Sequence, residues 1–213
     1  TVAVNPHLYK QLSYDPLKDF AGVARVAAQP LVFVVSKTLP IKSVREFIAY
    51  AKTNPGKLNF ASSGNGTSSH LSGIMINVAA GINTVHVPYN SVPQALVDLG
   101  RGDVSYMMYP YVGLLPAIQG GRVQPLATTG ASRASFLPDL PSMVESGYPE
   151  FVIAPWFGFY APKGTPKAIV DQWSRAVETT LKQPELIKLL ANTGTDTWYS
   201  GPEELERFTA SEI

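Results

Sequence analysis

Residues 57–81, which read KLNFASSGNGTSSHLSGIMINVAAG, most constrain the fold that this chain can adopt. They predict a short strand over 58–61, a loop of small residues over 62–67 and a helix that ends at Gly81. Gly64 and Gly66 allow the loop backbone to turn sharply and to approach a ligand closely. Serine and threonine can cap the helix and leave its first N–H groups free to bind an anion. An ordinary strand-to-helix turn that binds nothing fits the same residues.

Strand and helix patterns alternate along the rest of the chain. β-branched residues predict two strand pieces over 23–35, broken at Pro30, and the second piece, LVFVV, has the pattern of a strand buried between parallel neighbours. The alternation predicts βαβ units in an α/β fold, with mainly parallel sheets and helices on both faces.

Several helices have recognisable start signals. Ser43 and Ser142 each open a capping box, Ser91 can cap a helix from Val92, and Thr165-Pro166 reads as a cap followed by proline in the first helical position. The helix after Thr165-Pro166 is expected to direct four apolar side chains inward, namely Ile169, Val170, Trp173 and Val177.

Composition excludes several classes of protein. The formal net charge is +1 and no run of like charges occurs, which argues against a nucleic-acid partner bound through a basic face. The absence of cysteine excludes disulfides, thiolate metal sites and a cysteine nucleophile. The longest apolar run, 31–35, is too short to span a bilayer. The chain opens without an initiator Met or a signal peptide and stops inside a helical pattern, so we expect a fragment or a processed chain.

Motifs for catalysis are missing. The glycine-rich loop has serine where a dinucleotide fingerprint needs its third glycine, and neither a P-loop lysine nor a G-x-S-x-G elbow occurs. The three histidines, His7, His70 and His86, lie far apart in the sequence, without a partner at metal-ligand spacing. We therefore expect no catalytic residues, no metal and no cofactor, and an α/β enzyme stays only as an alternative.

Three loops fall at the carboxyl ends of predicted parallel strands, over 62–68, 88–91 and 109–111. Open α/β sheets bind ligands at that edge, and two of these loops lead into helix N-termini. One charge-assisted hydrogen bond is worth about 1.5–3 kcal/mol, whereas micromolar affinity needs about 8 kcal/mol. The convergence predicts an anion-binding cleft in which the first loop is one wall and a second wall is required.

Short motifs that point to one family are spread almost from end to end. They are Asn5-Pro6-His7-Leu8-Tyr9, Tyr14-Asp15-Pro16, Lys18-Asp19-Phe20, Pro55-Gly56-Lys57-Leu58-Asn59, Ala61-Ser62, Gly64-Asn65-Gly66-Thr67, His70-Leu71, Val87-Pro88-Tyr89, Pro138-Asp139-Leu140-Pro141, Trp156-Phe157-Gly158, Ala161-Pro162 and Gly164-Thr165-Pro166. With these motifs the chain resembles the Bug-type extracytoplasmic solute-binding receptors of tripartite tricarboxylate transporters, without the family's N-terminal segment.

The resemblance implies a two-lobed, periplasmic-binding-protein-like fold of type II. Residues 1–31 and 158–213 would form an incomplete first lobe, and residues 32–157 would form the second lobe. It further implies a periplasmic receptor that does not itself span the membrane and that captures a small carboxylate for membrane permease subunits. A ligand-sensing signalling module on the same fold is the alternative from a different class.

The resemblance also implies the residues at the ligand. The first loop would contribute Ser62, Ser63, Gly66, Thr67 and Ser68, and the second loop would contribute Tyr89, Asn90 and Ser91. His70, in the first turn of the helix, and Tyr109, after a later strand, complete the candidate set. For His70 a capping or helix-surface role is favoured over contact with the ligand.

Two departures from the family pattern bear on the ligand. The second loop reads Tyr89-Asn90-Ser91 where Tyr-Lys-Gly is usual, and Tyr109-Pro110 stands where Asp-Asn is usual. Losing a lysine and an aspartate makes the expected site less polar, so a more apolar or aromatic carboxylate fits. Three further residues near Tyr109 are expected in the core instead, namely Tyr106, Met107 and Met108.

Overall fold

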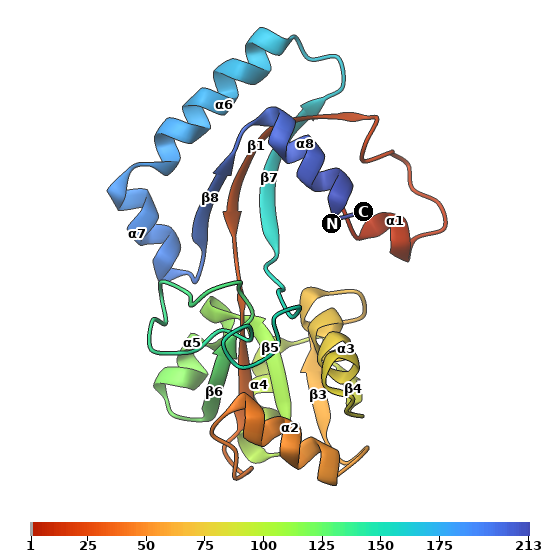
Figure 1. The fold of residues 1–213 in the computed structure, drawn as a ribbon, viewed down its shortest axis with the longest axis vertical. Coiled ribbons are helices and arrows are strands. Elements are labelled where there is room, and N and C mark those ends of the chain that lie inside the picture. Colours follow the sequence, from red (N-terminus) through yellow and green to blue (C-terminus); the bar gives the residue numbers. More distant parts are fainter. Residues whose placement is uncertain (1) are drawn as a thin grey trace. The chain divides into compact units, whose positions relative to one another are not determined.

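The computed structural model describes residues 2–213 (Figure 1). The chain divides into two compact units, one formed by the chain up to Ala28 together with Trp156–Ile213, the other by Gln29–Pro155. The first unit contains α1 (Asn5–Leu8), β1 (Phe20–Ala28), β7 (Trp156–Pro162), α6 (Lys167–Leu181), α7 (Pro184–Asn192), β8 (Asp196–Ser200) and α8 (Pro202–Ser211). The second contains β2 (Leu31–Ser36), α2 (Val44–Thr53), β3 (Asn59–Ser62), α3 (Ser68–Ala80), β4 (Val85–Pro88), α4 (Val92–Arg101), β5 (Tyr106–Pro110), α5 (Tyr111–Gln119) and β6 (Val123–Thr128).

The strand pairings correct one part of the predicted fold class. In the second unit the order is β4-β3-β5-β2-β6, in which β3 pairs in parallel with β4 and β5, while β2 is antiparallel to β5 and β6. In the first unit β1 lies between β7 and β8 and is antiparallel to both. The prediction of mainly parallel sheets is therefore wrong, because most of the strand pairs are antiparallel. The chain leaves the first unit at the end of β1 and returns at the start of β7, so these neighbours run in opposite directions.

Helices cover both faces of the five-stranded sheet, as predicted. Alternate residues of β2 belong to different clusters, because successive side chains of a strand point to opposite faces. Leu31, Phe33 and Val35 pack with α2 and α3, whereas Val32 and Val34 pack with α4 and α5. Because helices cover both faces, every residue of β2 is buried. The apolar run of β2 therefore indicates burial, and it does not indicate whether the neighbouring strands are parallel or antiparallel.

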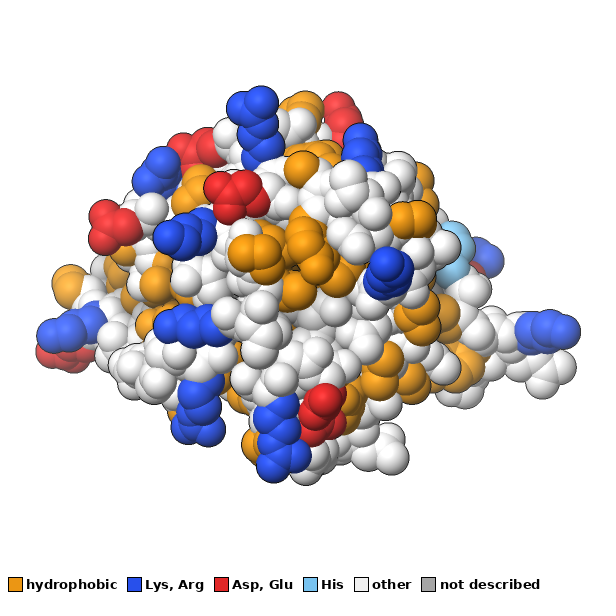
Figure 2. All heavy atoms as spheres, turned by 90° about the horizontal axis from the view of Figure 1, so that it is seen from below, with side chains coloured by type: hydrophobic (Ala, Val, Ile, Leu, Met, Phe, Trp, Pro, Cys, Tyr) orange, Lys and Arg blue, Asp and Glu red, His pale blue; other side chains and the backbone are white. Residues whose placement is uncertain are grey.

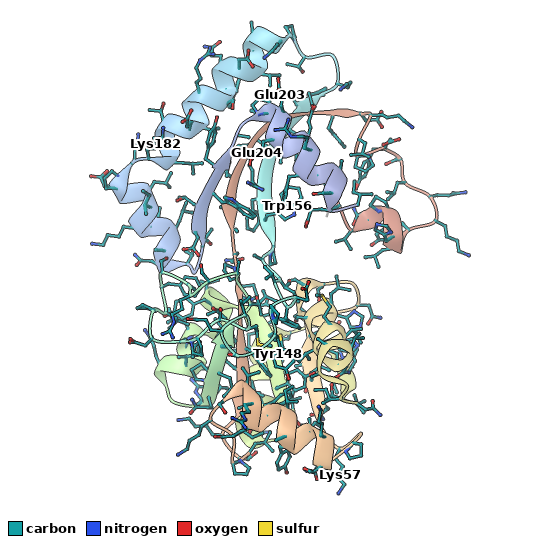
Figure 3. The ribbon with its side chains drawn as sticks, in the orientation of Figure 1. Lys57, Tyr148, Trp156, Lys182, Glu203 and Glu204 are labelled. Carbon is teal, nitrogen blue, oxygen red and sulfur yellow. The ribbon has the colours of Figure 1, made fainter. Side chains whose placement is uncertain are left out.

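The three residues expected in the core are there. Tyr106 and Met108 lie in the cluster on the α2–α3 side, and Met107 lies in the cluster on the α4–α5 side. The Tyr106 ring is tilted against Phe33 and edge-on to Phe47, with ring centroids 5.5 Å and 4.9 Å apart. Tyr148, labelled in Figure 3, is partly buried and packs against the same cluster.

The start signals give local hydrogen bonds with mixed consequences. Glu46 N–H donates to Ser43 Oγ at 3.2 Å, and α2 follows as predicted. At Ser142 the capping-box bonds also form, from Glu145 N–H to Ser142 Oγ and from Ser142 N–H to the Glu145 carboxylate, but only turns follow. A short helix before Gly147 is therefore a wrong prediction. The bonds of a capping box satisfy the ends of a turn as well as those of a helix.

In the first unit, Arg25 of β1 ties the sheet to α8. Its side chain is buried between two aromatic rings, 3.6 Å from the centroid of Trp198 and 4.4 Å from that of Phe208. Arg25 also forms an ion pair with Glu204 of α8, in which Arg25 Nη2 lies 3.5 Å from the carboxylate (Figure 3). Cation–π attraction is stronger when the cation is shielded from water, so the two rings stabilise the buried guanidinium charge of Arg25.

Candidate ligand-binding site

The carboxyl ends of β3, β4 and β5 meet at one edge of the five-stranded sheet. Ser62 pairs with Pro88 and Ala61 pairs with Met107, both in parallel register. The backbone N–H of Tyr89 donates to the carbonyl of Ser62 at 2.9 Å, so the first two predicted loops are neighbours. The third does not exist as a loop, because β5 runs through Pro110 and α5 begins at the next residue.

The glycine-rich loop is a tight turn that leads into α3. Gly64 and Gly66 have φ values of 115° and 75°, in the region that other residues rarely adopt. Thr67 caps α3, since its Oγ1 accepts the N–H of His70 and also contacts the carbonyl of Gly64 at 2.7 Å. The predicted strand, loop and helix are confirmed, and α3 ends at Gly81 in a left-handed conformation.

Serine side chains of the loop divide into two groups. Ser62 Oγ accepts the N–H of Gly64 at 3.1 Å, and Ser63 N–H donates to the buried Ser69 Oγ at 3.1 Å. These hydroxyls therefore hold the loop in shape. Ser68 is different, because neither its hydroxyl nor its backbone N–H has a partner within residues 2–213. Ser69 was not among the residues predicted from the sequence to shape the site.

Tyr89 and Ser91, in the second loop, are used differently from expectation. The Tyr89 hydroxyl donates to the Asp98 carboxylate at 2.9 Å, and burial together with Asp98 raises the pKa of Tyr89 to about 12. Its hydroxyl is thereby directed to α4. Ser91 stands at the cap position of α4 but makes no capping hydrogen bond, which corrects the predicted cap. Asn90 and Ser91 are exposed.

Tyr109 lies at the end of β5 and is partly buried. Its ring packs with the core on the α4–α5 side of the sheet and faces Gly113, where an added Cβ would lie 2.5 Å from Tyr109 Cε1. The ring therefore has a fixed place beside the carboxyl edge, and it depends on glycine at position 113.

Two of the three histidines meet beside the glycine-rich loop. The rings of His70 and His86 lie 4.2 Å apart, and Phe60 stacks on His86 at 4.9 Å between centroids. The prediction that the histidines lie apart is wrong for this pair, because the parallel register of β3 and β4 places His86 beside Phe60. Within residues 2–213 no group of three or more His, Cys, Asp or Glu side chains could hold a metal ion.

The stability of the protein should depend on pH through His86. Burial, and secondly the nearby His70, lower the pKa of His86 below its ordinary value of 6.5. At a pH below 6.5 the unfolded chain then binds more protons at His86 than the folded chain does. The contribution of neutral His86 to stability is therefore fully present above pH 6.5, and it is lost as the pH falls through the pKa of His86 in the folded chain. Thermal unfolding across this range should show the decline in the wild type. The decline should be smaller in His86→Gln and should remain in His7→Asn; equal slopes in all three proteins would contradict the prediction.

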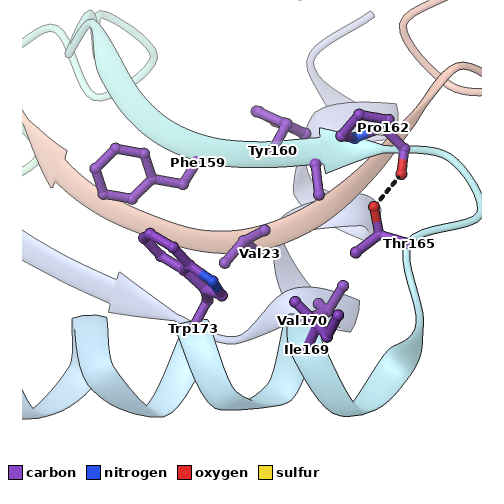
Figure 4. A pocket seen from close by; sticks show the side chains of 9 residues that line it. Val23, Phe159, Tyr160, Pro162, Thr165, Ile169, Val170 and Trp173 are labelled. Carbon is purple, nitrogen blue, oxygen red and sulfur yellow. Dashed lines mark hydrogen bonds between the residues drawn. The ribbon is translucent and has the colours of Figure 1, made fainter.

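A separate apolar groove of about 280 Å³ lies in the first unit, lined by residues of β1, β7 and α6 (Figure 4). Its one drawn hydrogen bond joins the Thr165 hydroxyl to the carbonyl of Pro162 at 2.8 Å. Ile169 and Trp173 border the groove and are 46% and 64% exposed, so the prediction that they face inward is wrong. The remaining lining offers no charged side chain to a carboxylate, so the groove does not have the chemistry of the predicted anion site.

Charged groups on the outer surface form no single patch on the face drawn in Figure 2. Lys and Arg side chains stand apart there, with uncharged surface and some Asp and Glu between them. In the part of the chain that the structure describes, no helix is long and apolar enough to cross a membrane.

The two α/β units and the loops at the sheet edge define the class of periplasmic binding proteins. The solved structure of the periplasmic binding protein BugD is 31% identical, with a TM-score of 0.81 over 100% of this chain and 72% of that chain. A structure of R. palustris Rpa4515 with adipate is 32% identical, with a TM-score of 0.83 over 96% of this chain and 69% of that chain.

Within that class the family is defined by the sequence. The model of the tripartite tricarboxylate transporter family receptor matches residues 1–213, and the chain belongs to this family. Protein BugT of Bordetella pertussis is 32% identical over 212 residues, which cover 100% of this chain and 65% of BugT. The chain thus spans less than two thirds of that curated relative.

Proposed function

We propose that this protein is a periplasmic receptor that captures a small carboxylate and delivers it to the permease subunits of a tripartite tricarboxylate transporter. The observation that carries the proposal is the glycine-rich loop of a receptor-family chain, placed with a second loop at the carboxyl edge of the sheet. The adipate bound to a relative supports a carboxylate as the ligand. In this proposal residues 29–155 form the second lobe and the other unit is part of the first lobe.

The candidate residues take two roles in this proposal. Ser68, Asn90 and Ser91 donate hydrogen bonds to the carboxylate, because their polar side chains are free of the capping and loop bonds described above. The Tyr109 ring provides an apolar wall. The others shape the loops, namely Ser62, Ser63, Gly66, Thr67, His70 and Tyr89.

The local charge favours recognition by neutral donors. Residues 58–97, which contain both loops and α3, include no Asp, Glu, Lys or Arg. Free N–H groups and the dipole of a helix favour an anion at the helix N-terminus without a cationic side chain. With Tyr109 nearby, we propose an aliphatic or aromatic carboxylate with an apolar body as the ligand.

Calorimetry of the complete protein tests the proposal. Adipate, malate and an aromatic carboxylate are titrated in separate runs, with a neutral sugar and a divalent cation as controls. Binding of at least one acid, without binding of the sugar or the cation, is the expected result. Binding of the sugar or the cation alone would contradict a carboxylate receptor.

Replacing Thr67 by valine should weaken carboxylate binding about five- to tenfold, because the loop loses the Thr67 cap and its contact with Gly64. Thr67→Ser keeps the hydroxyl and should lose much less. Thr179→Val is a matched control, since Thr179 Oγ1 bonds only to a carbonyl within α6. Calorimetric affinities of the four proteins give the comparison, and an unchanged affinity in Thr67→Val would remove Thr67 from the site.

Delivery to a permease is tested in cells. A strain without the gene should lose uptake of the carboxylate and should regain it with the wild type, but not with a variant that cannot bind. Normal uptake together with a lost transcriptional response to the acid would instead favour the signalling alternative.

A further inference from the structure

His70 and His86 each contact the glycine-rich loop through one ring nitrogen. The N–H of Gly66 donates to His70 Nδ1 at 3.2 Å. His86 Nε2 lies 2.6 Å from Ser62 Oγ, the hydroxyl that accepts the N–H of Gly64. With their rings 4.2 Å apart, the two histidines contact the start and the end of the loop and also each other.

The bond from Gly66 fixes the protonation of His70. A ring nitrogen that accepts a hydrogen bond carries a lone pair, so the neutral His70 has its proton on Nε2. The next proton can bind only at Nδ1, where it faces the N–H of Gly66, and the hydrogen bond is lost. His86 can bind a proton and still donate from Nε2 to Ser62, but its charge then opposes a charge on His70.

The strands packed against the helix that contains His70 carry no carboxylate. The strands packed against α3 are β5, β3 and β4, and like α3 and the loop they contain no Asp, Glu, Lys or Arg. From these elements His86 is the titratable group that faces His70. The Tyr106 hydroxyl is bonded to Thr84 and the Tyr89 hydroxyl to Asp98. Lys57 precedes β3, whereas the loop follows the other end of that strand (Figure 3).

We propose that His70 and His86 form a pH-sensitive latch on the glycine-rich loop. The uncharged pair holds the Gly66 amide, and protonation of His70 releases it. His70 is thus a positioning residue that acts through Gly66. The effect on ligand binding rests on the proposed function, because it requires that this loop bind the carboxylate; the affinity for the carboxylate then falls when His70 is protonated.

Amide exchange of Gly66 in the complete protein without ligand tests the latch directly. Rates are divided by those of an unstructured peptide at the same pH. From about pH 7.5 to about pH 5, protection in the wild type should fall about fivefold, the loss expected for one backbone hydrogen bond. H70N keeps an acceptor near the position of Nδ1 and does not titrate, so its protection should stay constant. H70L lacks an acceptor and should be unprotected throughout. Constant protection in the wild type, or an equal fall in H70N, overturns the latch.

Adipate affinity gives the functional readout. Relative to H70N, which corrects for the titration of adipate itself, the wild type should lose about fivefold over the same range. A rise in affinity relative to H70N overturns the latch, since the imidazolium would then attract the carboxylate directly.

The latch and the receptor function can fail separately. If exchange behaves as expected and no carboxylate binds at any pH, the receptor function fails and the latch stands; if carboxylates bind and Gly66 exchange is independent of pH, the latch fails and the receptor function stands.

Discussion

Replacing Phe47 by alanine should destabilise the second unit by about 3–5 kcal/mol, the usual cost of emptying a buried aromatic site. Phe47 is completely buried on α2. Its ring is edge-on to both Phe33 and Tyr106, with centroids 4.9 Å apart in each pair. Loss of the ring therefore removes apolar burial and two aromatic contacts at once.

Urea unfolding followed by far-UV circular dichroism measures this effect. Phe47→Leu should cost less, because it refills part of the volume. Arg45→Ala, on the exposed side of the same helix, should change stability by less than about 0.5 kcal/mol. All three tryptophans lie in residues 156–213, so their fluorescence reports the first unit and provides an internal reference. A loss below about 1 kcal/mol for Phe47→Ala would show that the cluster repacks.

Replacing Gly73 by alanine should also destabilise the second unit, although alanine is the better helix former. A Cβ at Gly73 would lie 2.1 Å from Phe60 Cε2, well inside van der Waals contact. Phe60 cannot turn away easily, because it is buried and stacked against His86 and Tyr106. Overpacking costs about 1–3 kcal/mol, and the gain in helix propensity is about 1 kcal/mol. We expect a net loss of up to about 2 kcal/mol.

Gly100 in α4 provides the matched control. It is also a helical glycine, but an added Cβ would approach nothing closer than 3.9 Å. Gly100→Ala should therefore stabilise the protein by up to about 1 kcal/mol. Urea midpoints of the two variants should move in opposite directions. A stabilised Gly73→Ala would mean that Phe60 yields, and the Gly66 amide should then be examined in that variant, since Phe60 supports the histidine pair.

Local signals in the sequence predicted the elements that form the site. Thr67 and the two loop glycines lie within a few residues of α3, and their bonds to one another are local, so the strand, loop and helix could be predicted. The same holds for the break at Pro30 between β1 and β2. The strand β8 was not predicted, because DTWYS is short and partly polar and is defined by its pairing with β1.

Apolar periodicity was informative about burial, with limits. The run LVFVV is fully buried as expected, but its neighbours are antiparallel. A continuous apolar run indicates that both faces of a strand are covered. Helices can cover both faces whether the neighbouring strands are parallel or antiparallel. In α6, Val170 is buried as predicted and Trp173 is exposed beside an open groove, because periodicity identifies an apolar face and does not say what covers it.

The class of the chain, the strand–loop–helix unit and the convergence of two loops at a sheet edge can be predicted from the sequence alone. Which polar groups of that edge are free depends on the tertiary structure. It directs the Tyr89 hydroxyl to Asp98, uses Ser62 within the loop and brings His70 against His86. These contacts join residues that are distant in the chain, and strand register brings them together. A single sequence contains the residues of such a pair, whereas the packing of β3, β4 and α3 makes them neighbours.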